Sequence, residues 1–154
     1  MIKVIKLLCL ALIACFGFST QAQAQPNPVK WDFKVEKTKK KGQYKLVATA
    51  KMGQDWAIYS QFISDEGPVP TTFEYELPAN AALIDKTNEI SDHKIEGMDE
   101  TFGIELIKYK KEVVFEQLVQ AKAKQELKGV ITYMVCNNET CLPPRDVPFA
   151  VKLK

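Results

Sequence analysis

Residues 130–153 read Val-Ile-Thr-Tyr-Met-Val-Cys-Asn-Asn-Glu-Thr-Cys-Leu-Pro-Pro-Arg-Asp-Val-Pro-Phe-Ala-Val-Lys-Leu. The first six are rich in β-branched side chains, which is typical of a strand. In residues 147–153 a large apolar side chain stands at every second position, the period of a half-buried strand. Pro143 and Pro144 cannot donate to a central ladder, so the chain must turn or follow a sheet edge there. The stretch therefore predicts a strand, a tight exposed loop with a stiff exit, and a second strand.

The rest of the chain has the same short-strand character. Further strands are predicted at Trp31–Glu36, Tyr44–Met52, Trp56–Phe62, Thr72–Leu77 and Val113–Val119. Residues 79–107 are polar and less regular, with Gly97 and Gly103 as breaks, and residues 120–128 read as a polar turn. About seven short strands without an amphipathic helix predict an all-β, antiparallel sandwich rather than a parallel α/β sheet.

Residues 1–24 have the pattern of a secretory signal peptide. Met1–Lys6 carries two lysines, Leu7–Phe18 is apolar, and the segment ends in the small-x-small pattern Ala22-Gln23-Ala24. The apolar run is shorter than the roughly 20 residues that span a bilayer, and no later stretch is apolar enough. We therefore expect residues 25–154 to form one exported domain without a membrane span.

Two other observations bear on the exported part. Leu12-Ile13-Ala14-Cys15 offers an alternative in which Cys15 is lipidated, but apolar residues continue beyond it, so cleavage after Ala24 is favoured. The chain has 154 residues and a net charge of +2, and both signal lysines leave with the signal, so the remainder is neutral. Net charge thus gives no electrostatic case for nucleic acid or an anionic membrane. The lysines of Lys37–Gly42 are interpreted as a solvated hairpin tip, because no aromatic residues are interleaved.

Few residues could carry chemistry. His93, the only histidine, lies among polar residues and is interpreted as a surface loop residue. A zinc site needs about four ligands, and the cysteines with one distant histidine supply at most three, so no metal and no cofactor are expected. Of the four cysteines, Cys9 and Cys15 lie in the signal, which leaves Cys136 and Cys141 in an exported protein where disulfides persist.

The pair Cys136 and Cys141 is either a structural staple or a reagent. A structural disulfide is the common fate of such a pair in a secreted domain. Closing so short a loop contributes only about 2 kcal/mol, however, and an exposed bridge is accessible to an attacking thiolate. No histidine or helix N-terminus is evident to lower a thiol pKa, so the pair would suit a passive partner of a more activated thiol. Both roles stay open on these grounds.

The segment from Val130 to Cys136, the short polar loop, and Cys141-Leu142-Pro143-Pro144 resemble the active-site segment of the N-terminal periplasmic domain of the thiol:disulfide interchange protein DsbD. Residues 53–59 and 67–71 resemble that family's early aromatic strand and loop, with Trp56 and Tyr59 as supporting residues. The resemblance implies an immunoglobulin-like β-sandwich with a cap loop over the cysteine pair. The loop between the cysteines is shorter here than in the best-known members.

Asp99-Glu100-Thr101-Phe102-Gly103 is similar to the family's cap loop, whose aromatic residue shields the cysteines. The resemblance assigns the shield to Phe102, with Thr101 as the other occupant of that place. It also implies that Cys141 makes the intermolecular bond and that Cys136 resolves it, with Pro143 and Pro144 supporting the loop.

The resemblance implies a periplasmic protein-disulfide reductase. It would relay electrons through Cys136–Cys141 from a thioredoxin-like donor to oxidised clients, which in the family include cytochrome c biogenesis proteins. The membrane-embedded and thioredoxin-like parts of DsbD are not in this sequence, so we expect donor and membrane transporter on separate chains. The alternative is a non-catalytic immunoglobulin-like binding module whose disulfide is structural.

Overall fold

The computed structural model describes residues 27–154, so the predicted signal peptide and Cys15 lie outside the described residues. Within this part the chain forms ten strands and no helix, and accordingly no helix that could cross a membrane. The predicted all-β class is confirmed. The strands are β1 (Val29–Lys37), β2 (Gln43–Met52), β3 (Ala57–Tyr59), β4 (Thr72–Glu76), β5 (Ala82–Ile90), β6 (Lys94–Asp99), β7 (Ile104–Lys110), β8 (Glu112–Gln120), β9 (Glu126–Cys136) and β10 (Cys141–Lys152).

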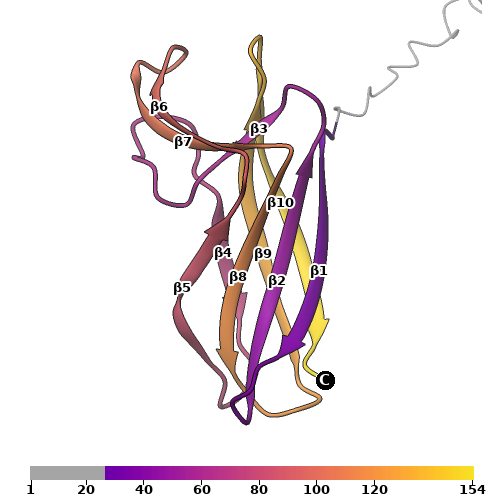
Figure 1. Ribbon diagram of the computed structural model, residues 1–154. Helices are drawn as coiled ribbons and strands as arrows, with labels where there is room; N and C mark the ends of the chain where they lie inside the picture. Colours follow the sequence, from indigo (N-terminus) through magenta and orange to yellow (C-terminus); the bar gives the residue numbers. More distant parts are fainter. Residues whose placement is uncertain (1–26) are drawn as a thin grey trace, which may run out of the picture.

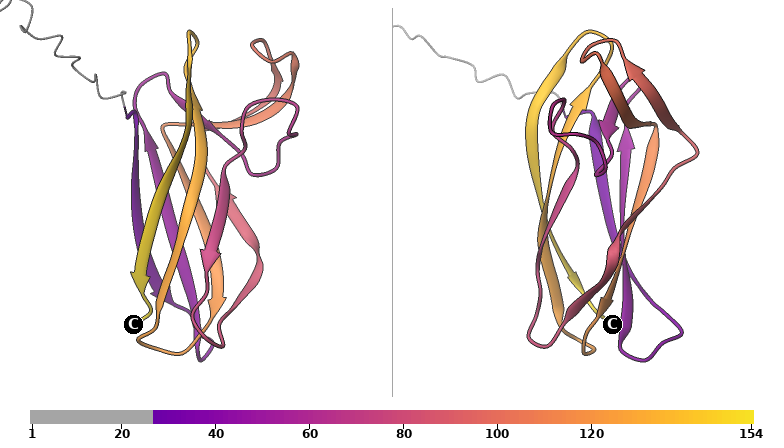
Figure 2. Two further views of the ribbon diagram at one scale, coloured as in Figure 1. Left: turned by 180° about the vertical axis from the view of Figure 1, so that it is seen from behind. Right: turned by 90° about the vertical axis from the view of Figure 1, so that its left-hand side faces the viewer.

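The strands form two antiparallel sheets that face one another, an immunoglobulin-like sandwich (Figure 1; Figure 2, right). One sheet has the order β1-β2-β8-β5, and the other has the order β10-β9-β3-β7-β6 with β4 also paired to β9. Strands β2, β8 and β9 bury every second side chain, because one face of each packs on the opposite sheet. The largest fully buried residues include Tyr133, Phe115 and Leu46, one from each of these strands.

Strands β6 and β7 form a hairpin that extends beyond the body of the sandwich (Figures 1 and 2). The hairpin lies at the same end of the molecule as the loop between β9 and β10. The sequence pattern missed β5, β6 and β7, which lie wholly or mostly in the irregular stretch 79–107. Strands β5 and β6 lie at sheet edges and are largely exposed, so neither needs alternating apolar residues. Strand β7 is an inner strand, but its buried residues Leu106 and Tyr109 are not at alternate positions. The predicted strand Trp56–Phe62 is shorter than expected, since only Ala57–Tyr59 is paired.

The two prolines lie where the sequence required them. Strand β10 is an edge strand of its sheet, and its register against β9 shifts between Leu142 and Arg145. Pro143 and Pro144 occupy this irregularity, where no ladder donor is needed, and both are exposed. The predicted strand at 147–153 therefore begins earlier, at Cys141.

Gly129 is required by close packing in the first half of β9. A Cβ atom there would lie 2.3 Å from the carbonyl oxygen of Glu74 and 2.6 Å from Phe149 Cζ. We expect Gly129→Ala to reduce the free energy of unfolding by about 2 kcal/mol through overpacking, as measured by urea denaturation. Gly53→Ala is the control, because its Cβ would make ordinary 3.6 Å contacts. Equal stability of the two variants would contradict this packing.

Candidate functional site

Cys136 and Cys141 face each other across the tip of the β9–β10 hairpin and form a disulfide, with their Cα atoms 4.1 Å apart. Asn137 N–H donates to the carbonyl of Thr140 at 2.9 Å and closes the turn. The Asn137 Oδ1 atom accepts hydrogen bonds from the N–H groups of Glu139 and Thr140, at 2.9 and 2.8 Å. An Asn side chain that binds the backbone ahead of it favours a tight turn, so the local sequence itself brings the cysteines together.

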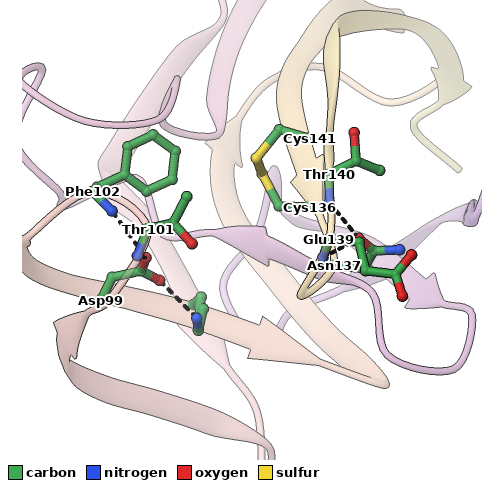
Figure 3. Close-up of a disulfide and its surroundings, with 9 residues drawn as sticks. Asp99, Thr101, Phe102, Cys136, Asn137, Glu139, Thr140 and Cys141 are labelled. Carbon is green, nitrogen blue, oxygen red and sulfur yellow. Dashed lines mark hydrogen bonds and ion pairs between the residues drawn. A yellow bond between two sulfur atoms is a disulfide. The ribbon is translucent and has the colours of Figure 1, made fainter.

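The two cysteines have different surroundings. Cys136 ends a central strand, pairs with Ala57 of β3 and is only 5% exposed. Cys141 begins the edge strand β10 and is half-buried. The disulfide, which lies at the hairpin tip (Figure 3), therefore has one enclosed and one more accessible half.

The predicted cap loop, residues 99–103, is the turn between β6 and β7 and lies opposite the cysteine hairpin (Figure 3). Asp99 organises this turn. Its Oδ1 atom accepts hydrogen bonds from Thr101 N–H at 2.9 Å and Phe102 N–H at 3.3 Å, and its Oδ2 atom accepts one from Lys108 Nζ at 2.7 Å. Gly103 adopts φ +68° and donates its N–H to the Asp99 carbonyl at 2.8 Å, a conformation that suits glycine.

The charges at the cap are set by burial and pairing. Burial by itself would raise the pKa of Asp99, but the hydrogen bond from Lys108, with those from Thr101 and Phe102, holds the pKa below its ordinary value of 3.8. Asp99 is thus ionised at neutral pH. Burial, together with the nearby charge of Asp99, raises the pKa of Tyr59 to about 12, so its phenol stays neutral.

The lowered pKa of Asp99 predicts a pH-dependent contribution to stability. Because the pKa is lower in the folded chain, the contribution is fully present above the unfolded pKa and is lost as pH falls through the folded pKa. We expect Asp99→Asn to lower the free energy of unfolding by about 1–2 kcal/mol at neutral pH. Below pH 3.8 the difference from wild type should shrink towards zero. Denaturation curves across this pH range test the prediction, and a difference that does not change with pH would contradict it.

Phe102 and Thr101, the two candidates for the shield, have different surroundings. Phe102 packs against the apolar cluster of Tyr59, Leu106 and Cys136, and its ring meets Tyr59 edge-on with centroids 6.2 Å apart. Thr101 instead faces an open cleft next to Cys136. The aromatic residue therefore secures the cap beside the cysteines, while the small polar residue lines the space in front of them.

This cleft, of about 300 Å³, lies between the cap and the cysteine hairpin. Sequence reasoning named Tyr59, Cys136 and the cap residues Asp99, Glu100 and Thr101 among its walls. It missed Asp55, Ala57, Met98, Lys108, Lys110, Asn137 and Asn138. Lys108 and Lys110 could have been found only with the register of β7 known, since alternate residues of that strand face the cleft.

Trp56 and Glu89 change the predicted set of supporting residues. Trp56 packs against the main sandwich core rather than the cysteine cluster. Glu89 of β5, which sequence reasoning missed, accepts hydrogen bonds from Ser60 Oγ at 2.6 Å and Gln61 N–H at 2.8 Å. Tyr109 OH at the base of β7 donates to it at 2.7 Å. Glu89 thus joins the opposite sheet to the segment after β3 and to the base of the β6–β7 hairpin.

The remaining candidates are not brought into this site. His93 lies in an exposed turn before β6. Across residues 27–154, no group of three or more His, Cys, Asp or Glu side chains is placed to hold a metal ion. The disulfide and its cap are therefore the features of the described chain with evident chemistry.

Comparisons with solved structures agree on the fold. The N-terminal periplasmic domain of ScsB from Proteus mirabilis is similar, with a TM-score of 0.61 and 20% identity, over 83% of this chain and 47% of that one. This chain thus spans about half the length of that structure. The reduced N-terminal domain of Neisseria meningitidis DsbD matches with a TM-score of 0.46 and 17% identity, over 70% and 75% of the two chains. Comparison with curated protein sequences gave no match.

A family model described as "Thiol:disulfide interchange protein DsbD, N-terminal" matches residues 21–152. The match covers both cysteines, the cap and every described strand. With its disulfide at a capped hairpin tip, this chain belongs to the family of DsbD N-terminal thiol:disulfide interchange domains.

Proposed function

We propose that this chain is a periplasmic protein-disulfide reductase module that relays electron pairs from a thioredoxin-like donor to oxidised client proteins. The observation that carries the proposal is the asymmetric disulfide. Cys141 lies on an edge strand at a hairpin tip, whereas Cys136 is buried beside it. A structural disulfide needs no accessible sulfur atom, whereas attack by an incoming thiolate requires one.

The relay is written as two exchanges. A donor thiolate attacks Cys141 Sγ, the Cys136–Cys141 bond breaks, and Cys136 leaves as a thiolate that takes up a proton. The donor's second thiolate then attacks the donor's first sulfur, which is bonded to Cys141, and Cys141 leaves as a thiolate. Two electrons have passed, so the donor is now a disulfide and the chain is a dithiol. Cys141 then attacks a client disulfide, and Cys136 resolves the new mixed disulfide, which restores the starting bond and leaves the client reduced.

The cap supports selectivity in this scheme. Phe102 packs against the small apolar cluster that contains Tyr59 and Cys136, and Asp99 holds the loop in place. A docking protein can displace such a loop with its binding energy, whereas a small oxidant or thiol brings little binding energy for this purpose. We infer that the cap lowers the rate of unwanted exchange and must move when a partner docks.

The test mixes the oxidised chain with reduced thioredoxin and counts free thiols by alkylation after acid quenching. Two new thiols should appear, at Cys136 and Cys141, much faster than with dithiothreitol at equal thiol concentration. If thioredoxin reduced the disulfide no faster than dithiothreitol, selective exchange would be contradicted. If neither reagent reduced it, the bond would be structural.

The stability of the Cys136→Ser plus Cys141→Ser variant is a separate prediction. Closing so short a loop contributes about 2 kcal/mol in the chain-entropy model. The sandwich has its own core of buried side chains from both sheets. We therefore expect the double variant to stay folded and to lose about 2 kcal/mol or less, by urea denaturation monitored with tryptophan fluorescence. Global unfolding without the bond would favour the alternative, a binding module with a structural disulfide.

A further inference from the structure

One end of the sandwich carries a cluster of lysines that the redox site does not use. The turn between β1 and β2 presents four exposed lysines, Lys37, Lys39, Lys40 and Lys41. This turn lies at the end of the molecule opposite the cysteine hairpin (Figure 1). The disulfide chemistry therefore gives no reason for its charge.

Two other segments add charge at the same end. Ala121 N–H donates to the carbonyl of Gly42 at 2.8 Å, which joins the β8–β9 turn to the lysine-rich turn. Lys124 N–H donates to the carbonyl of Leu153 at 2.6 Å, which joins residues 152–154 to the β8–β9 turn. The exposed lysines of these two segments are Lys122, Lys124, Lys152 and Lys154. We call the eight lysines together the basic end.

The basic end is not neutralised by neighbouring acids. Among the ion pairs of residues 27–154 none involves a lysine of the basic end. Glu126 lies directly opposite Lys152 on the neighbouring strand, but its ion pair is with Lys128, at 3.3 Å. Other exposed acids lie near the cysteines, with Asp55 and Glu100 in the cleft and Glu139 at the hairpin tip. Residues 25–154 have no net charge, but their charges are unevenly distributed, and the basic end has an excess of lysines.

The chemistry of the basic end favours phospholipid headgroups over nucleic acid. Residues 37–42, 121–125 and 152–154 contain neither arginine nor an aromatic residue. Nucleic-acid sites usually combine charge with arginine forks or stacked rings, which recognise phosphates and bases. Flexible lysines alone fit the diffuse negative potential of an anionic bilayer, where each one contributes about fivefold in affinity.

We propose that the basic end binds the surface of a bilayer that contains anionic phospholipids. Binding in this orientation directs the cysteine hairpin and its cap away from the lipid, where a protein partner can reach them. The proposal stands independently of the redox function, because it uses none of the residues of the site.

The test measures co-sedimentation of the protein with vesicles of phosphatidylglycerol and phosphatidylcholine in equal parts. We expect binding at low ionic strength that weakens as salt screens the charges. Replacement of Lys39, Lys40 and Lys41 by Gln should weaken binding about 100-fold. The matched control replaces three exposed lysines outside the basic end, Lys30, Lys86 and Lys111, by Gln, and should weaken it only a few-fold. Both variants should keep the wild-type melting temperature.

Acetylation of lysines in the presence of vesicles reports the orientation. Lys39–Lys41 should be protected from the reagent, whereas Lys94 and Lys110, on the β6–β7 hairpin, should react as in free protein. No binding to the anionic vesicles, or equal losses in the two triple variants, would overturn the proposal. The protein could also bind duplex DNA at least as tightly as the vesicles, with the same lysines protected. That result would assign the basic end to nucleic acid and would also overturn the proposal.

Discussion

The Cys136→Ser variant should form a stable mixed disulfide with a thioredoxin that retains a single active-site cysteine. The variant leaves Cys141, the half-buried cysteine on the edge strand, as a free thiol. If the thioredoxin cysteine is first loaded with thionitrobenzoate, the Cys141 thiolate attacks its sulfur and thionitrobenzoate leaves. A covalent complex then accumulates, because Cys136 is no longer there to resolve it. Its appearance is followed on non-reducing gels, and the release of thionitrobenzoate by absorbance.

The matched control is Cys141→Ser, which leaves Cys136 as the free thiol. Cys136 is 5% exposed and pairs with β3, and it borders only the cleft under the cap, so an attacking protein sulfur reaches it less readily than Cys141. We expect much less complex with this variant under conditions that convert all of the Cys136→Ser protein. Equal yields would show that both sulfurs are accessible and would contradict the assigned roles. Trapping through Cys136 alone would reverse them.

Asp99→Ala should release the cap and accelerate reduction of the disulfide by small reagents about 30- to 100-fold. The Asp99 side chain is 4% exposed, and it accepts hydrogen bonds from two backbone N–H groups and from Lys108. Hydrogen bonds to a charged group contribute about 1.5–3 kcal/mol each, and part of that loss is recovered by water when the loop opens. A net loss of about 2–3 kcal/mol in the closed state raises the open fraction by the stated factor.

The measurement is the rate of reduction by tris(2-carboxyethyl)phosphine, which has no protein surface with which to displace the cap. Glu105→Ala is the control, since Glu105 is an exposed carboxylate on the same hairpin. It should react at the wild-type rate. The reaction with thioredoxin should change much less than the reaction with the phosphine, because a docking protein displaces the cap in either case. A wild-type rate for Asp99→Ala with the phosphine would show that the cap does not protect the disulfide.

Much of the fold could be predicted where burial imposes a pattern on the sequence. Strands β9 and β10 were identified from β-branched and alternating residues, and the two prolines correctly indicated a sheet edge. Strands β5 and β6 were missed because their exposed faces carry polar residues as a loop would, and β7 was missed because its buried residues do not alternate. A local pattern cannot report a strand whose pairing partners, rather than its own side chains, hold it in place.

The site likewise has a part that lies within one segment and could be predicted, and a part that depends on strand pairing and could not. The cysteine pair lies within one short segment, so its spacing could be read directly. The anchor of the cap depends on Asp99 and Lys108, which become neighbours only through the β6–β7 register. Glu89 reaches the base of the hairpin from the opposite sheet, 20 residues before Tyr109, and no sequence signal marks it. The different surroundings of Thr101 and Phe102 likewise could not be predicted from their positions in the sequence.

The reduction potential of the Cys136–Cys141 pair tests the central claim most directly, namely that the bond is exchanged reversibly. It can be measured by equilibrating the protein with defined ratios of reduced and oxidised dithiothreitol and counting alkylated cysteines. We predict a potential above about −300 mV, in the range where thioredoxin-like proteins exchange electrons with their partners. A potential well below about −300 mV would place the bond among structural disulfides and contradict the account.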